Sequence, residues 1–266
     1  MAAAGLAVGC HALTRPSAEP PAAPLIGLTL PLLPSPYLRL AVRGMLNRRP
    51  VEVWLESSRA LTVVTSLCLA PTENPSAKTV RIPLAEGGFE ILPLARLKSL
   101  TLEGVLLPES PVGVRKSREP CRVTLGMDVL EEYGLAVDPA VGTVSFLHSQ
   151  AASSGEALEL SRDPTTDLAM LPIRIHSSGG DTVAPFVIST TEAQTSVSPD
   201  FLRRFQPLAL ELGPEIRVPP GRWKAAPNWG NKAAVGLLGT EVLGNFAFTL
   251  DFKAQRLTLR KPPEPP

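Results

Sequence analysis

Leu125-Gly126-Met127-Asp128-Val129-Leu130 decides the fold, because the chain carries a second version of it, Leu238-Gly239-Thr240-Glu241-Val242-Leu243. The residues behind each stretch also correspond: Tyr133, Asp138 and Thr143–Phe146 in the first copy, and Phe246, Asp251 and Arg256–Leu259 in the second. Matching positions lie 113 residues apart (239 − 126), without a gap over more than twenty residues. Self-similarity of this length predicts two copies of one supersecondary unit.

Each copy predicts the same order of elements. An apolar strand ends at the Leu-Gly pair, and a short helix follows with Asp128 or Glu241 in its first turn, where the helix dipole favours an acidic side chain. Two alternating strands separated by a turn close each unit. Upstream, we expect strands at 37–43 and 51–55 in the first copy, and at 171–176 and 185–188 in the second. These features place the repeats at 37–148 and 168–261, joined by a polar linker at 149–167.

The composition limits the classes of function. The chain has 266 residues, with 26 Lys and Arg against 25 Asp and Glu, so it lacks the excess of basic residues that nucleic-acid binding needs. The 29 prolines argue against long helices. No Cys or His pair has the spacing of a zinc site, and the sequence predicts no metal and no cofactor. No apolar run is long enough for a spanning helix.

The two ends of the chain differ from the repeats. Residues 1–36 contain seven prolines and predict a disordered, Pro-rich segment, although Leu25–Leu33 has the character of a strand at a sheet edge. Small residues before Cys10 resemble a bacterial lipoprotein cleavage box, which makes Cys10 a candidate lipidation site; the basic segment of a signal peptide is missing. A cell-envelope lipoprotein and a cytoplasmic protein therefore both stay open. The Pro-rich composition of residues 262–266 predicts a frayed tail.

This order of elements resembles the retropepsin-like, or acid protease, fold of the pepsin-like aspartic proteases. A strand hairpin, a loop, a long β region, and then an apolar strand with Leu-Gly and a short helix follow one another in both repeats, most clearly at 123–146 and 236–259. The resemblance implies an all-β protein with few short helices. It also implies that the two tandem units form a bilobal pseudo-dimer within one chain, so we expect a monomer.

In that family, the loop after the second strand reads Asp-Thr-Gly, and two such aspartates meet between the lobes. Here the matching positions are Glu56, Ser57 and Ser58 in the first repeat and Ser189, Thr190 and Thr191 in the second. Catalysis needs two carboxylates that share one proton, and Ser189 cannot ionise. The resemblance therefore implies a catalytically inactive, aspartic-protease-like protein that acts by binding an extended peptide or protein partner, with no catalytic residue assigned.

The alternative is an atypical aspartic endopeptidase built on Glu56. Glu192 could supply a second carboxylate, although it lies three residues out of register with Ser189. An exposed loop acid is the simpler interpretation of Glu192.

Three further predictions concern residues between the loops and the Leu-Gly strands. Gly87, Gly88 and Phe89 stand where the family carries its flap, a hairpin that closes over bound peptide; an ordinary hairpin turn is the equal alternative. Trp223 and Trp229 are candidates for peptide-binding or packing aromatics. Cys68 lies twelve residues past Glu56 and Cys121 five before Gly126, which we expect to place them on different sides of the unit, without a disulfide.

Overall fold

The computed structural model describes residues 24–35, 37–69, 75–151, 154–213, 216–218 and 223–260. Over these residues the protein is all-β, and its helices are short, as the sequence predicts. They are α1 (Met127–Leu130), α2 (Pro199–Arg204), α3 (Thr240–Leu243) and the 3-10 turn η1 (Ser66–Cys68). None of these is long and apolar enough to cross a membrane.

The first repeat forms a nine-stranded sheet in the order β5-β6-β9-β4-β10-β3-β2-β7-β8. Its strands are β2 (Ala41–Leu46), β3 (Arg49–Leu55), β4 (Val63–Thr65), β5 (Thr79–Pro83), β6 (Phe89–Leu97), β7 (Leu100–Leu102), β8 (Val105–Leu106), β9 (Ser110–Arg115) and β10 (Arg122–Leu125). Apolar residues alternate along β2 and β3, so that one face of each strand is buried.

The second repeat forms its own sheet in the order β19-β18-β15-β16-β21-β17-β20, with β14 paired to β15. Its strands are β14 (Ser161–Arg162), β15 (Ala169–Ser177), β16 (Thr182–Ile188), β17 (Ser196–Val197), β18 (Pro207–Glu211), β19 (Arg217–Val218), β20 (Lys224–Ala225) and β21 (Gly236–Leu238).

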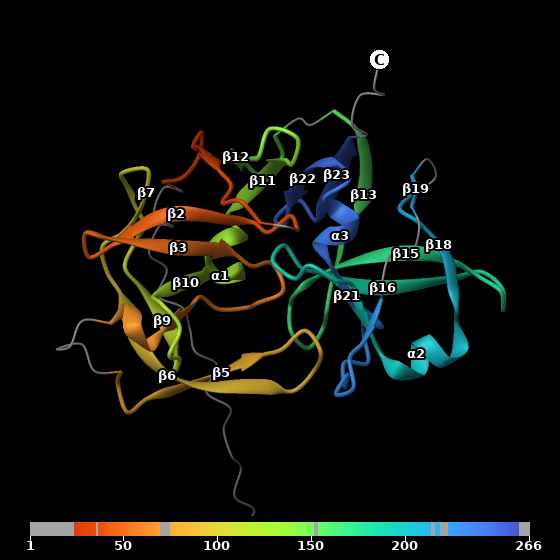
Figure 1. The fold of residues 1–266 in the computed structure, drawn as a ribbon, viewed down its shortest axis with the longest axis horizontal. Coiled ribbons are helices and arrows are strands. Elements are labelled where there is room, and N and C mark those ends of the chain that lie inside the picture. Colours follow the sequence, from red (N-terminus) through yellow and green to blue (C-terminus); the bar gives the residue numbers. More distant parts are fainter. Residues whose placement is uncertain are drawn as a thin grey trace, which may run out of the picture.

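A third sheet joins the repeats in the order β1-β12-β11-β22-β23-β13. Its strands are β1 (Thr29–Pro31), β11 (Tyr133–Asp138), β12 (Thr143–His148), β13 (Glu156–Glu159), β22 (Ala247–Asp251) and β23 (Arg256–Arg260). The junction is the antiparallel pair β11–β22, with Leu135 opposite Leu250. Figure 1 shows this sheet above and between the first-repeat strands (orange to yellow-green) and the second-repeat strands (teal to blue).

Strand registers reproduce the repeat seen in the sequence. Leu125 in β10 lies beside Leu55 in the parallel strand β3, and Leu238 in β21 lies beside Ile188 in the parallel strand β16. Val64 opposite Val123 corresponds in the same way to Val197 opposite Gly236. The expected equivalences of Gly126 with Gly239 and of Glu56 with Ser189 agree with these registers.

Both repeat glycines are required by close contact. A Cβ on Gly126 would lie 2.6 Å from the carbonyl carbon of Leu61, and one on Gly239 would lie 2.5 Å from that of Gln194. The φ angles of the two glycines are −97° and −83°, which any residue can adopt. The need for glycine therefore comes from packing of the loop backbone against the Leu-Gly strand.

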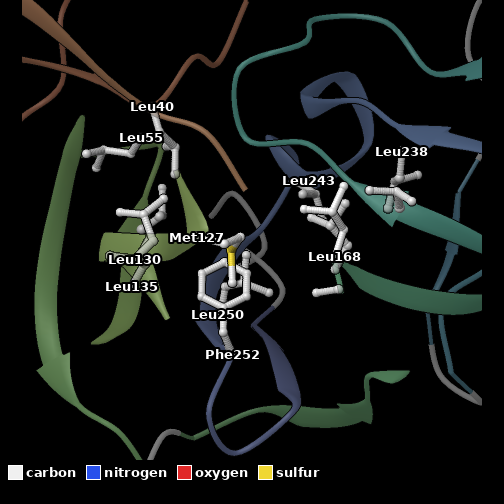
Figure 2. Packing of buried hydrophobic residues seen from close by; sticks show 14 of the residues in the cluster. Leu40, Leu55, Met127, Leu130, Leu135, Leu168, Leu238, Leu243, Leu250 and Phe252 are labelled. Atoms are coloured by element: carbon white, nitrogen blue, oxygen red, sulfur yellow. The ribbon is translucent and has the colours of Figure 1, made fainter. Parts of the chain in front are cut away.

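One hydrophobic core runs through both repeats. In Figure 2 the labelled side chains extend from Leu55 and Leu130 on the first-repeat side, past Met127 and Leu250, to Leu238 on the second-repeat side. This shared core and the β11–β22 pairing make the two repeats one folded body.

The described residues of the segments before the first repeat and between the repeats are more ordered than their composition predicts. Leu25 and Leu30 are buried, and β1 is an edge strand, as the pattern of Leu25–Leu33 predicts. Residues 1–23, which include Cys10, and the tail 262–266 lie outside the described residues. The polar segment 149–167 contains β13 and β14. Leu158 and Leu160 alternate there with polar residues, and both are buried. This is the alternation of a strand, although the polar composition of the whole segment predicts a linker.

The expectation that Cys68 and Cys121 stay apart is wrong. The structure joins them in a disulfide, with their Cα atoms 4.5 Å apart. Strand β4 returns antiparallel beside β10, with Val64 opposite Val123, so the turn after β4 lies next to the residue before β10. Counting residues from the loop and from Gly126 misses this return of the chain.

Candidate functional site

The loops that follow β3 and β16 meet between the two repeats. Glu56, Ser57, Ser189 and Thr190 are all buried there. The Ser189 hydroxyl donates a hydrogen bond of 3.0 Å to Oε1 of Glu56. The two positions that the sequence resemblance matches to paired aspartates are thus in direct contact, as one carboxyl group and one hydroxyl group.

The neighbouring residues exchange hydrogen bonds across the interface. The Ser57 amide donates to Oγ1 of Thr190 over 3.0 Å, and the Ser57 hydroxyl donates to the Ile188 carbonyl over 2.7 Å. In the opposite direction, the Thr190 hydroxyl donates to the Leu55 carbonyl. Ser57 and Thr190 have their hydroxyl groups committed in this way, so their role is to fix the two loops against each other.

Glu56 is held in one orientation by three donors. Its Oε1 accepts from the Ser58 amide (3.1 Å), the Ser58 hydroxyl (2.6 Å) and the Ser189 hydroxyl. Among the described residues, no hydrogen bond reaches Oε2. Burial raises the pKa of Glu56 above the ordinary 4.5, and the hydrogen bonds from Ser58 and Ser189 and the charge of Arg59 only partly offset this. The site therefore shifts the protonation equilibrium of Glu56 toward the neutral acid.

Among the described residues, the Ser189 hydroxyl contacts no potential base other than the Glu56 carboxyl group. Its Oγ accepts from the amides of Glu192 (3.0 Å) and Thr191 (3.4 Å), and its own proton points to Glu56. A hydroxyl oriented toward a carboxyl group that favours the neutral form is a hydrogen-bond donor rather than a nucleophile. Thr191, the third residue of the second loop, is buried, and its carbonyl accepts from Nε of Arg39.

A cavity of about 670 Å³ lies over these loops, and we refer to it as the cleft. Both repeats line it. The lining residues are Tyr37, Arg39, Glu56, Ser58, Arg59, Leu84, Ala85, Glu86, Glu192, Ala193, Gln194, Ser196, Lys224, Ala225, Ala226, Pro227, Asn228, Trp229 and Leu237. This volume is in the range of ordinary ligand sites.

Two arginines at the cleft are fixed by their neighbours. The Arg39 guanidinium lies 4.4 Å from the centre of the Trp54 ring, and Arg59 pairs with Glu90 at 3.1 Å. Sequence reasoning missed both, because neither belongs to the three-residue loops. For Arg39, the sequence offered one signal: it lies just before β2, the strand that pairs with β3 and so leads to the Glu56 loop.

The predicted flap is a hairpin, and only part of it faces the cleft. Leu84, Ala85 and Glu86, in the turn between β5 and β6, line the cleft, whereas Gly87, Gly88 and Phe89 do not. The backbone of Gly87 instead packs on the loop at 230–231, and Phe89 is exposed with Arg81 stacked 3.4 Å from its ring centre. In Figure 1 this hairpin (gold) reaches from the first repeat toward the second.

The other candidate residues have separate roles. Trp229 lines the cleft, with its indole N–H donating to the Ala234 carbonyl, whereas Trp223 packs against Phe186. Glu192 lines the cleft and is exposed; the hydrogen bonds on Glu56 come from Ser58 and Ser189 rather than from a second acid. In the described part of the chain, no group of three or more His, Cys, Asp or Glu residues could hold a metal ion.

No family model matches this chain, and no curated protein matches its sequence. The fold and site therefore define its class by themselves: an all-β protein of two similar units, with a cleft between them that has one buried carboxyl group at its base.

Proposed function

We propose that this protein is a catalytically silent member of the aspartic-protease-like proteins, which binds an extended peptide or protein segment in the cleft without cleaving it. The hydrogen bond from the Ser189 hydroxyl to Glu56 is the main support for the proposal. In this arrangement the Ser189 hydroxyl occupies the position that a second carboxylate would need.

Cleavage in this class needs an ionised carboxylate that activates water beside a protonated one that polarises the scissile carbonyl. Glu56 and Ser189 provide one carboxyl group and one hydroxyl group. The raised pKa shifts Glu56 toward its neutral form, which cannot take a proton from water. The arrangement supplies a hydrogen-bond donor, and it lacks the partner that would generate a nucleophile.

Binding requires only what the site does contain. With three donors directed at Oε1 of Glu56, the proton of the neutral acid is left to Oε2, on a residue that lines the cleft. A donor in that position suits a carbonyl oxygen of a peptide backbone. Main-chain groups and side chains from both repeats line the rest of the cleft, as recognition of an extended chain requires.

The test is affinity selection of peptides from a library, followed by mass spectrometry of what is bound. Ala226 lines the cleft, so Ala226→Trp should fill it and weaken binding of the selected peptides at least about tenfold. Val141 is 71% exposed on the β11–β12 turn, so Val141→Trp is the matched control and should bind as the unmodified protein does. Equal binding by both variants would refute a peptide site in the cleft.

A second candidate, an endopeptidase with an atypical site on Glu56, is favoured by one observation. Glu56 is a buried acid with a raised pKa at the base of a cleft that also contains the Glu192 carboxylate. A cleavage assay separates the two candidates.

A further inference from the structure

The tip of the β5–β6 hairpin is bonded to the second repeat. The carbonyl of Glu86 accepts hydrogen bonds from the amides of Gly230 (2.6 Å) and Asn231 (2.9 Å), and the carbonyl of Ala85 accepts one from Nδ2 of Asn231 (2.9 Å). Ala85 and Glu86 are two of the three hairpin residues that line the cleft, with Leu84 as the third. The hairpin is therefore tied down at the point where it covers the site.

Asn231 is itself fixed in every direction. Its Nδ2 also donates to Oδ2 of Asp163 over 2.6 Å, while its Oδ1 accepts from the amides of Ala233 (2.8 Å) and Ala234 (3.2 Å). Both amide hydrogens and both acceptor positions of the side chain are used. Such a side chain cannot rotate without losing several bonds, so it is a rigid anchor for the hairpin.

Asp163 completes the arrangement from the segment that joins the repeats. It is 1% exposed, and its Oδ1 accepts from the amides of Thr165 (2.8 Å) and Thr166 (3.1 Å). This tight turn places Oδ2 toward Asn231. Three separate segments of the chain, at 85–87, 163–166 and 230–234, thus converge on one side of the cleft.

Close packing excludes side-chain bulk at the contact. A Cβ on Gly87 would lie 2.7 Å from the amide nitrogen of Asn231 and from the carbonyl carbon of Gly230. Gly87 also has a φ of +99°, a backbone conformation that favours glycine. The glycine that the sequence suggested as a flap residue is therefore placed to let the hairpin tip sit directly on the second repeat.

We propose that Asn231 and Asp163 form a latch that holds the hairpin over the cleft, and that a ligand entering from the side requires this latch to open. A hairpin of this kind can lift only if three hydrogen bonds to Ala85 and Glu86 are broken. A chain end can thread under the closed hairpin, whereas the middle of a long chain cannot. Asn231 is a positioning residue in this mechanism, and the latch limits the exchange of any occupant of the cleft.

The sharpest perturbation is Asn231→Asp, which keeps Oδ1 for Ala233 and Ala234 but replaces the donor with an acidic oxygen facing Asp163 and the Ala85 carbonyl. The matched control is Lys232→Gln, next to Asn231 on the same loop, which also lowers the net charge by one, at an exposed side chain that is not among the residues lining the cleft. Gly87→Ala is a second, independent way to force the tip away.

Hydrogen exchange reads the latch directly. We expect the amides of Gly230 and Asn231 to exchange at least about tenfold faster in Asn231→Asp, with the β22 and β23 amides unchanged. Access to the cleft is read with Ala193→Cys in a Cys10→Ser background, because Ala193 lines the cleft. A bulky maleimide should react at least about tenfold faster when Asn231→Asp or Gly87→Ala is added, and a small thiol reagent should react at a similar rate in all variants.

Equal reaction rates of the bulky reagent with and without both latch substitutions would overturn the proposal, as would an equal acceleration by Lys232→Gln. Neither measurement needs a ligand, so failure of the latch and failure of the proposed peptide binding are distinguished. Unfolding of either variant would accelerate exchange in β22 and β23 as well, and the other variant then decides the outcome.

Discussion

The two repeats share a framework and differ in what they attach to it. Both place a loop after the same strand and pack it against a Leu-Gly pair, but Gly126 lies 70 positions after Glu56 in the first repeat, and Gly239 lies 50 positions after Ser189 in the second. The additional length in the first repeat includes the hairpin over the cleft, and the Cys68–Cys121 disulfide is also found there. The second repeat contributes the hydroxyl beside Glu56 and the anchor for the hairpin.

Backbone packing therefore constrains the residue types of the two repeats more strongly than side-chain chemistry does. Gly126 and Gly239 are alike because nothing else fits, whereas Glu56 and Ser189 differ and still meet through a hydrogen bond. Each prediction below perturbs one side of this comparison.

The largest effect is expected from the disulfide, which has no counterpart among the described residues of the second repeat. Its ends are 53 residues apart, and closure of a loop of that length stabilises the folded chain by about 4 kcal/mol in the chain-entropy account. Cys68→Ser with Cys121→Ser should lower the free energy of unfolding by up to that amount, measured by urea denaturation. Unchanged midpoints in the double variant, and in the unmodified protein with and without reductant, would contradict the bond.

The two repeat glycines should cost nearly the same when replaced. Gly126→Ala and Gly239→Ala each force a Cβ into loop backbone, and each should lower the free energy of unfolding by about 3 kcal/mol. Gly179→Ala is the control, because its nearest neighbour atom would be 3.8 Å away, and it should change little. Strongly unequal losses at Gly126 and Gly239, measured by thermal or urea unfolding, would break the equivalence of the repeats.

A smaller effect distinguishes Glu56 from Ser189. Because burial raises the pKa of Glu56 above 4.5, the folded protein binds more protons than the unfolded chain between 4.5 and the raised value. Stability from this group is thus complete below pH 4.5 and is lost as the pH rises through the folded pKa, by at most about 1.4 kcal/mol per pH unit. Glu56→Gln should flatten this dependence of the free energy of unfolding on pH. At a pH above the folded pKa of Glu56, the variant should be more stable than the unmodified protein.

Glu192→Gln is the matched control for that measurement, since it removes an exposed carboxylate from the same cleft. It should retain the slope of the unmodified protein. If Glu56→Gln and the control unfold with the same pH dependence, Glu56 does not have the pKa shift on which its assignment as a neutral acid depends.

Sequence information was sufficient where the signal is local or repeated. The Leu-Gly pairs, the short helices and the alternating strands behind them are continuous in sequence, so the all-β fold and the two loop positions could be predicted. The Cys68–Cys121 bond and the Asp163–Asn231 contact could not, because each depends on which strands and loops return to one another. Asp163 in particular lies in a segment whose polar composition resembles a linker.

The central claim, that one carboxyl group and one hydroxyl group make a binding site without catalysis, is tested most directly by a cleavage assay. The purified protein and Glu56→Gln are incubated with a broad peptide library from about pH 3 to pH 7, with and without a transition-state-mimicking inhibitor of aspartic proteases. Ser189→Asp alone should remain inert, because under the proposed function Glu56, Ser58 and Thr191 would still differ from the Asp-Thr-Gly loops of active aspartic proteases. The account predicts intact peptides in every sample. Cleavage by the unmodified protein that the inhibitor blocks and Glu56→Gln abolishes would contradict it.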